Sequence, residues 1–390
     1  SDAISSSAYA TEEIVRVLVL GGVAALALSL PTSIAIALLL GVVAFSYRQV
    51  CIAYPTGGGS YSVSKANFGK IASLVAASAL LIDYTLTVAV STSSAVEQIV
   101  SAVPSVAPIA VAIGVGAITL LTIGNLRGLR EAGNIFAVPT YLFLGGALIM
   151  IVLGVIQVLT GDHPGYTAEQ VARQQSAVES LSLILVLRAF ASGAVALTGT
   201  EAIATGVPAF KPPESRNAAT TLLVMAILLA TLFIGITFLS LSFGVLPIEQ
   251  PARETVIAQV AAHVYGDGSI PFYLFQAFTA LLLFLAANTS FAAFPRLAAV
   301  LAQDGFFPRQ FAFRGDRLAF SMGIVVLGVF AAALVIAVGG QTHTLIPLYA
   351  VGVFIDFTIS QAGMIRHWLR DRPPGCRYRL ALNATGCAPP

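Results

Sequence analysis

The stretch Leu81-Ile82-Asp83-Tyr84-Thr85-Leu86-Thr87-Val88-Ala89-Val90-Ser91-Thr92-Ser93-Ser94-Ala95-Val96-Glu97 carries two carboxylates through an otherwise apolar segment. With about 100° of rotation per residue, one side of a helix here collects the polar side chains Asp83, Thr87, Ser91, Ser94 and Glu97. A charge at bilayer depth costs at least about 2.5 kcal/mol and is kept where it faces a cavity, a partner or an ion path. The stretch therefore predicts a membrane helix with one polar, water-accessible face beside an ion or solute pathway.

The composition indicates an all-α polytopic membrane protein. Of the 390 residues, 57% are hydrophobic and 10% are charged, whereas a soluble chain is about 25% charged. Apolar runs of about 20 residues, which cross a hydrocarbon core of about 30 Å, recur along the chain. They predict ten spans, roughly 4–30, 33–53, 71–101, 106–124, 135–160, 178–208, 217–243, 269–295, 321–339 and 343–365. One membrane domain accounts for the whole sequence.

The basic residues predict the orientation, because Lys and Arg in short loops collect on the cytoplasmic side. With a cytoplasmic N-terminus, sixteen fall inside: Arg48, Lys65, Lys70, Arg127, Arg130, Lys211, Arg216, Arg296, Arg309, Arg314, Arg317, Arg366, Arg370, Arg372, Arg377 and Arg379. Only Arg173 and Arg253 fall outside, and Arg16 and Arg188 lie within spans. We expect a multi-pass protein of the bacterial plasma membrane, with the lipid bilayer as a partner and no nucleic-acid partner.

Spans 1 and 6 are the candidates for broken helices. Span 1 opens with a run of serines, Ser1-Asp2-Ala3-Ile4-Ser5-Ser6-Ser7, and span 6 contains Leu197-Thr198-Gly199-Thr200-Glu201 at mid-depth. Polar or glycine-interrupted helices in corresponding positions of two halves point to the binding site of an inverted-repeat transporter. With five spans in each half, an odd number, the second half must be inverted. We expect repeats at about 1–160 and 178–366.

The turn Tyr54-Pro55-Thr56-Gly57-Gly58-Gly59-Ser60-Tyr61 permits a second interpretation. Three glycines suggest a phosphate cradle, but the trailing Gly-Lys-Ser/Thr of a nucleotide-binding loop is absent. We favour a tight cytoplasmic turn that leads into an interfacial helix.

Of the carboxylates in or at the membrane, four matter most: Asp2, Asp83, Glu201 and Asp356. Arg16 is expected to pair with the nearby Glu12 and Glu13, which leaves the candidate cavity acidic. Carboxylates together with hydroxyls suit a cation, since hard cations take oxygen ligands. Glu201 suits a proton carrier.

More ordinary roles remain open for some of these acids. Asp2 could be a helix N-cap, Glu201 a structural hydrogen-bonding acid, and Glu97 a solvated vestibule residue. The three cysteines and four histidines show no metal-site spacing, so we expect no cofactor and no enzyme.

These residues carry a resemblance to a family. Six blocks contribute to it: 1–9, 54–61, Asp83-Tyr84, 197–202, Ala286-Ala287-Asn288-Thr289-Ser290-Phe291 and 345–352. Together they resemble the KimA-type potassium transporters, a KUP-related branch of the amino acid-polyamine-organocation superfamily. The resemblance runs through all ten predicted spans.

The resemblance implies a LeuT-like 5+5 inverted-repeat fold and proton-coupled potassium uptake, that is, K⁺/H⁺ symport. It also implies which residues lie along the potassium path: Asp2, Tyr9, Tyr84, Thr87, Ser91, Thr198 and Tyr349, with Asp83 beside them. Glu201 would be the coupling carboxylate. Asp356 stands where the family pattern has no acid, so it is a possible modifier of coupling or selectivity.

The resemblance further implies that a half-helix before Ser1, two last spans and a cytosolic domain that holds a homodimer lie outside this sequence. Residues 1–366 would form the transporter core, and residues 367–390 a cytoplasmic juxtamembrane segment with the start of a further span. An amino acid or polyamine permease of the same superfamily is the alternative. In amino acid permeases a glycine-rich break of span 1 binds the substrate carboxylate, and Asp2 at that position would repel a carboxylate. A cationic solute without a carboxylate is not opposed by this charge. A receptor or scaffold would explain the hydropathy but not the aligned acids.

Overall fold

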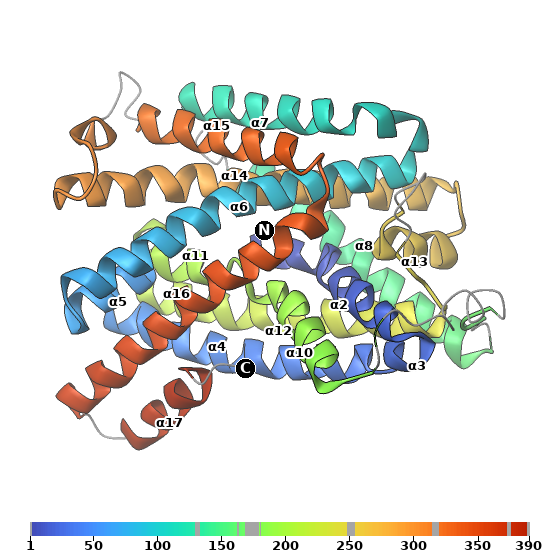
Figure 1. The fold of residues 1–390 in the computed structure, drawn as a ribbon, viewed down its shortest axis with the longest axis horizontal. Coiled ribbons are helices and arrows are strands. Elements are labelled where there is room, and N and C mark those ends of the chain that lie inside the picture. Colours follow the sequence, from blue (N-terminus) through green and yellow to red (C-terminus); the bar gives the residue numbers. More distant parts are fainter. Residues whose placement is uncertain are drawn as a thin grey trace.

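The computed structural model describes residues 2–128, 133–161, 164–167, 179, 181–247, 254–313, 320–372 and 376–387. Five of the basic residues used to predict orientation lie outside these ranges, namely Arg130, Arg173, Arg253, Arg314 and Arg317. The described residues form helices and turns, with no strand among them (Figure 1). The prediction of an all-α protein is confirmed.

The long helices run roughly along the longest axis of the molecule (Figure 1). The helices are α1 (Asp2–Ser5), α2 (Ala10–Leu18), α3 (Val23–Leu26), α4 (Ser29–Ala53), α5 (Gly59–Asn67), α6 (Lys70–Ala102), α7 (Ala110–Leu126), α8 (Gly133–Leu159), α10 (Leu183–Gly193), α11 (Thr200–Thr205), α12 (Glu214–Ser242), α13 (Val256–Tyr265), α14 (Ile270–Gln303), α15 (Ser321–Ala337), α16 (Thr342–Asp371) and α17 (Cys376–Cys387). Short 3-10 segments join several of them.

Eight helical segments of the described chain are long and apolar enough to cross a membrane. They are Val23–Ala53, Lys70–Ala102, Pro104–Leu126, Ala137–Leu159, Leu183–Thr205, Glu214–Ser242, Ile270–Gln303 and Thr342–Asp371. The predicted ninth span is the shorter apolar helix α15, and the predicted first span consists of the short pieces α1 to α2. A multi-pass membrane protein is therefore established, and the count of ten spans stays a prediction.

The boundary between the first two predicted spans was placed too late in the chain. The candidate span already begins at Val23, directly after Gly22, whose φ of 82° ends the preceding 3-10 turn. Pro31 lies in the first turn of α4, not at the end of a helix. The first turn of a helix tolerates proline because its backbone N–H groups have no intrahelical acceptor there.

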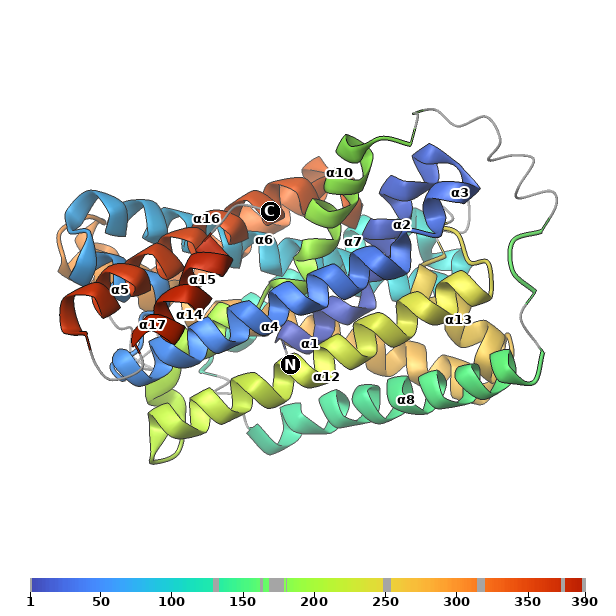
Figure 2. The same cartoon turned by 90° about the horizontal axis from the view of Figure 1, so that it is seen from below.

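Two helices are interrupted at mid-bundle, as the sequence predicts. The first breaks between α1 and α2, where a 3-10 turn, Ser6–Ala8, leads to Tyr9. The second breaks between α10 and α11, where Thr198 is extended and Gly199 is left-handed with φ 81°. A Cβ on Gly199 would lie 2.7 Å from the backbone nitrogen of Ala3, so the two breaks pack directly against each other. In Figures 1 and 2 the N-terminal end accordingly lies in the middle of the bundle.

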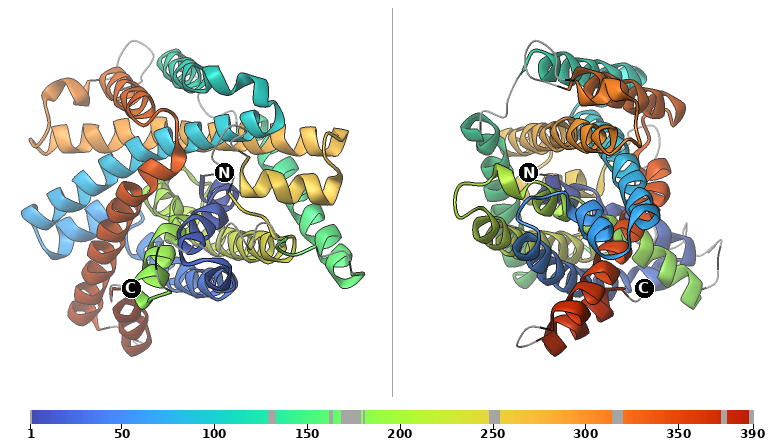
Figure 3. Two further views of the ribbon diagram at one scale, coloured as in Figure 1. Left: turned by 45° about the vertical axis from the view of Figure 1, so that its right-hand side comes forward. Right: turned by 90° about the vertical axis from the view of Figure 1, so that its left-hand side faces the viewer.

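The helices pack in pairs whose members stand five spans apart in the predicted order. Helix α2 packs against α10, α4 against α12, α6 against α14, and α7 against α15. Figure 3 shows α7 and α15 as an outer layer, with α6 and α14 beneath them. The polar face of α6 is therefore enclosed, and Asp83, Thr87, Ser91 and Ser94 are all buried.

In Figure 1 helix α5, the start of α6, the end of α14 and the end of α16 lie at the left of the bundle. We call this the basic end, because Lys65, Lys70 and Arg370 lie in these segments. There the turn before α5 has left-handed backbone at Gly57, Gly58 and Gly59, so the expected tight turn and following helix are confirmed. Helix α5 is tied to the end of α14, where Asp304 accepts hydrogen bonds from Lys65 (2.6 Å) and Tyr61. The bonds from Lys65 and Tyr61 lower the pKa of Asp304.

We predict that Gly199→Ala destabilises the protein, because the added Cβ meets the Ala3 backbone and the left-handed conformation disfavours a side chain. The left-handed penalty alone is about 1 to 2 kcal/mol. The measurement is the melting temperature of the purified protein in detergent. Gly116→Ala is the matched control, since its Cβ would meet nothing within 4 Å. Equal melting temperatures for the two variants would contradict the packing of the breaks.

Candidate functional site

Asp2 lines a cavity that extends to Gly57 of the glycine turn and to Arg296 of α14, near the basic end. The cavity holds about 1190 Å³ and is lined by the glycine turn, α11 and parts of α8, α12 and α14. From α14, Thr289 donates a hydrogen bond to Asp2, with 3.1 Å between Oγ1 and Oδ2. Thr289 also lines the cavity. A carboxylate and a hydroxyl thus meet where the cavity reaches the broken helix.

Hydroxyl groups surround the two breaks. The Ser6 and Thr198 hydroxyls lie 3.0 Å apart, and Tyr9 donates to Ser6 at 3.5 Å. On the facing helices, the hydroxyls of Thr87 and Tyr349 lie 2.8 Å apart. Tyr349 in turn lies within electrostatic reach of Tyr9, Asp2 and Asp83. The fold therefore brings most of the residues predicted for the ion path into one cluster.

Ser91 is linked to this cluster by its position on α6. It is buried one turn beyond Thr87 on the same face of α6. Its neighbours Thr92, Ser93 and Ser94 have buried hydroxyls without a hydrogen-bond partner among the described residues. Of these three, Ser94 lies on the same face of α6 as Ser91 and extends that polar face toward the end opposite the basic end.

Asp83 lies on α6 and Glu201 on α11, and the Asp83 carboxyl feels the charge of Glu201. Glu201 accepts one hydrogen bond, from the backbone N–H of Gly199 at 3.1 Å. Its second oxygen, both oxygens of Asp83 and the hydroxyl of Tyr84 have no partner among the described residues. Tyr84 faces Thr205 near the end of α11. Buried polar atoms of this kind are unusual and mark a place for a proton, an ion or water.

Asp356 completes a second group of acids. It is buried in α16 and accepts hydrogen bonds from Tyr47 of α4, at 2.9 Å, and from Ser60 of α5. Its charge reaches Asp83 and Glu201. None of Asp2, Asp83, Glu201 and Asp356 forms an ion pair with a described basic side chain. The expectation of an acidic interior without local arginine partners holds for this part of the chain.

On the side away from the basic end, hydrogen bonds close the bundle over the cluster. Glu12 pairs with Arg16 at 2.7 Å, as expected, and also accepts the backbone N–H of Val256 at the start of α13. The Thr255 hydroxyl donates to Gln98 of α6 at 3.1 Å. Glu12 and Gln98 thus hold α13 against α2 and α6.

Glu97 differs from its prediction as a solvated residue. It is half-buried and accepts both the backbone N–H (3.1 Å) and the hydroxyl (2.7 Å) of Thr342. The start of α16 supplies these two donors because it packs against α6. The sequence of α6 alone could not reveal them.

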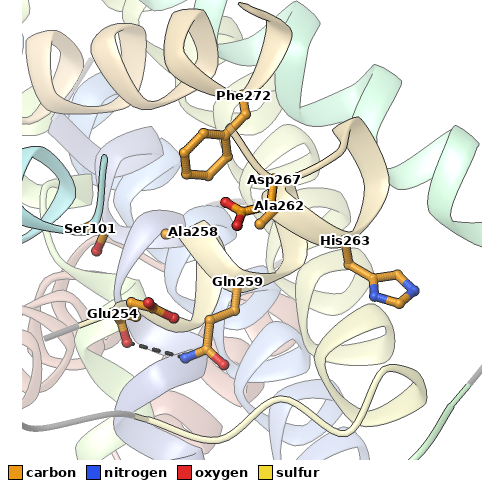
Figure 4. A pocket seen from close by; sticks show the side chains of 8 residues that line it. All are labelled: Ser101, Glu254, Ala258, Gln259, Ala262, His263, Asp267 and Phe272. Carbon is orange, nitrogen blue, oxygen red and sulfur yellow. Dashed lines mark hydrogen bonds between the residues drawn. The ribbon is translucent and has the colours of Figure 1, made fainter. Parts of the chain in front are cut away.

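A smaller pocket of about 360 Å³ lies beside α13 (Figure 4). Figure 4 shows Phe272 above Asp267, Glu254 and Gln259 below them, and the imidazole of His263 to the right. None of the residues predicted for the ion path lines this pocket. The large cavity is therefore the candidate route to the site.

Several members of the site could not be identified from the sequence. Thr289 was noted within the block Ala286-Ala287-Asn288-Thr289-Ser290 but given no role, and Ser6, Tyr47 and Ser60 were not singled out. The sequence feature that these residues share is a hydroxyl group in an apolar span or beside a turn. Such a hydroxyl can be assigned to a site only when its hydrogen-bond partner is known.

The comparisons with known proteins agree with this geometry. Residues 1–388 match the model of the amino acid permease family, and the chain belongs to that family of membrane permeases. The chain is also 46% identical over 388 residues to the potassium transporter KimA of Bacillus subtilis (strain 168). That match covers 99% of this chain and 63% of KimA. The predicted family relationship is confirmed, and with it the prediction that the chain is not an enzyme.

We predict that the cavity admits reagents only from the basic end. In a background with Cys51, Cys376 and Cys387 replaced, Ala292→Cys on the cavity wall should react with a membrane-impermeant thiol reagent applied at that end. Ala280→Cys is the control, because Ala280 lies buried on the same helix and does not line the cavity. Equal labelling of both cysteines, or labelling from the opposite side, would contradict the described opening.

Proposed function

We propose that the protein is a secondary active transporter for proton-coupled potassium uptake, working by alternating access. The observation that carries the proposal is the cluster of carboxylate and hydroxyl oxygens at the two helix breaks. No basic side chain that the structure describes is paired with its acids. Oxygen atoms of this kind can replace the hydration shell of a cation. Similarity to a protein named as a potassium transporter supports potassium as the ion.

The arrangement of openings supports alternating access. The cavity connects Asp2 to the basic end, while α13 is bonded to α2 and α6 on the other side. With the basic end in the cytoplasm, this is an inward-facing state that releases its ion to the cell. The pairing of helices five spans apart supports a LeuT-like 5+5 repeat, in which one half rocks against the other.

The two acidic groups have different roles: one binds potassium and the other binds the proton. Asp2, with Thr289, Tyr9 and Thr198 nearby, attracts and binds the potassium ion at the end of the cavity. Glu201 and Asp83, which have no ion-pair partner in the described part of the chain, bind the proton. Binding of the proton neutralises one carboxylate in the interior. The bound ion and the bound proton together therefore change the net charge that the protein carries when it changes conformation. A homodimer of the complete protein belongs to the same proposal.

An amino acid or polyamine permease is the second candidate, and the match to the amino acid permease family favours it. Two observations disfavour a substrate with a carboxylate. Asp2 would repel it, and the N–H of Gly199 at the second break already donates to Glu201. A polyamine has no carboxylate and is not opposed by charge.

The two candidates are separated by competition. We predict that labelled rubidium uptake into proteoliposomes with an imposed proton gradient is inhibited by excess potassium. Excess amino acids or polyamines should leave it unchanged. Inhibition by a polyamine would favour the second candidate, and rubidium uptake that potassium does not inhibit would exclude the first.

Asp2→Asn and Tyr84→Ala should abolish growth rescue of a potassium-uptake-deficient strain at low potassium. The first removes the only charge that lines the deep end of the cavity among the described residues, and the second removes a buried hydroxyl beside Glu201. Asp267→Asn and Tyr273→Ala change residues that are exposed or half-exposed elsewhere and should rescue normally. Normal rescue by the site variants, at equal membrane levels, would refute these roles.

Glu201→Gln should remove the dependence of uptake on external pH, because the amide cannot take up a proton. The measurement is initial rubidium uptake across a series of external pH values at constant membrane potential. The wild type should accelerate as the medium is acidified and the variant should not. A variant that still responds to acidification would place the coupling proton on another residue.

A further inference from the structure

The cavity that Asp2 lines is much larger than a potassium ion needs. It holds about 1190 Å³, whereas an ion with about six waters fills roughly 200 Å³, at about 30 Å³ for each water. Cavities of about 300 to 1000 Å³ with mostly apolar walls are typical sites for organic ligands. By its volume, this cavity can hold an organic molecule as well as an ion.

The walls of the cavity are mostly apolar. Three half-buried leucines come from three helices, namely Leu144 of α8, Leu228 of α12 and Leu285 of α14. Tyr61 and Tyr141 add aromatic side chains to the lining. Aromatic rings are the usual partners of alkylated ammonium groups in proteins. The walls therefore suit the apolar body of a ligand, and the rings suit an ammonium group.

Two charged residues line the cavity among the residues that the structure describes, Asp2 and Arg296. Thr289 of α14 donates to Asp2 at 3.1 Å. Arg296 follows Thr289 on the cavity side of the same helix by two turns, which is about 10 Å at 1.5 Å per residue. Neither Asp2 nor Arg296 forms an ion pair with another described residue. The cavity thus has a negative charge at one end and a positive charge on the side of the basic end.

This arrangement of charges selects among organic cations. A single positive charge is attracted to Asp2, where Arg296, about 10 Å away, weakens its binding by only about twofold in water. A second positive charge about 4 Å from Arg296 is weakened by about fivefold or more. Polyamines carry several ammonium groups along one chain, so they cannot place one group at Asp2 without bringing another toward Arg296.

We propose that this cavity is a binding site for a singly charged ammonium ion with an apolar body, of the tetraalkylammonium type. Its nitrogen lies near Asp2, its alkyl groups lie against the apolar walls, and Arg296 excludes ions with a second positive charge. An ion bound in this way closes the route between Asp2 and the basic end. The inference goes beyond the proposed function, because it depends on the cavity and not on which solute the protein transports.

The test measures occupation of the cavity in the complete protein in detergent. The native cysteines are replaced and Ala292→Cys on the cavity wall reports binding. The measured quantity is the concentration of a probe that halves the rate of thiol modification. Tetrabutylammonium should protect the thiol. Tetramethylammonium, which has the charge without the apolar body, should require at least about tenfold more.

A neutral probe and two variants test the position of the ammonium group. Tributylphosphine oxide, which has butyl groups but no net charge, should protect more weakly than tetrabutylammonium. Asp2→Asn should raise the tetrabutylammonium concentration by about tenfold and leave that of the neutral probe unchanged. Leu144→Ala should raise both by about threefold, whereas Leu142→Ala, outside the cavity on the same helix, should raise neither. Equal protection by the charged and neutral probes, or no effect of Asp2→Asn, would overturn the inference.

The role of Arg296 is tested with spermidine. Spermidine should not protect the thiol of the otherwise unchanged protein at concentrations at which tetrabutylammonium does. Arg296→Gln should lower the spermidine concentration by about fivefold or more and that of tetrabutylammonium by about twofold. Arg309→Gln is the control, because Arg309 is exposed at the basic end and does not line the cavity. Spermidine that protects as well as tetrabutylammonium would contradict the proposed selection.

Potassium separates this inference from the proposed function. If potassium binds at Asp2, adding it should raise the tetrabutylammonium concentration that is needed for protection. Protection that depends on Asp2 but does not respond to potassium would count against the proposed potassium site and leave the ammonium site intact. Absence of any protection by tetrabutylammonium would overturn the ammonium site alone.

Discussion

The structure depends on how a membrane protein keeps four carboxyl groups inside an apolar bundle without pairing them with described basic residues. Each charge is expensive at this depth, and the chain lowers that cost differently at each position. Thr289 donates to Asp2, the backbone of Gly199 donates to Glu201, and two hydroxyls donate to Asp356. Asp83 has no hydrogen-bond donor among the described residues. Buried carboxyl oxygens of this kind are places where a proton, an ion or water can bind.

The broken helices follow from the same requirement. A continuous helix uses its backbone donors and acceptors internally, so it offers an ion only side chains. The turn at Ser6–Ala8 and the extended Thr198 with left-handed Gly199 bring hydroxyls and backbone groups to mid-bundle. The close contact of Gly199 with the Ala3 backbone fixes the two breaks against each other. Irregular backbone at this depth is tolerated because it is enclosed by protein and reaches a cavity.

The family relationship and the site contribute different information. Membership of the amino acid permease family establishes the class of protein, but a shared fold hosts many substrates, so the solute must be argued from the site. In this chain an acid stands at the first break, and the backbone donor at the second break is occupied by Glu201. These features favour a small cation over a carboxylate-bearing solute. The difference lies in a few side chains, not in the arrangement of helices.

The sequence by itself determined the membrane character, most span positions, the two breaks and the polar face of α6. These features depend on local composition and on the periodicity of single helices, which can be read along the chain. The boundary between the first two spans was placed too late, between residues 30 and 33 on either side of Pro31, because proline is tolerated within a first helical turn as well as at a helix end. Local signals could not separate these two cases.

Only the tertiary structure decided which groups meet. The contacts of Asp2 with Thr289, of Glu97 with Thr342, and of Asp356 with Tyr47 and Ser60 join residues hundreds of positions apart. Only the packed bundle separates the cavity that reaches Asp2 from the group of acids behind it. Such pairings depend on how helices pack side by side, and no pattern within one helix records which partner its polar face will find.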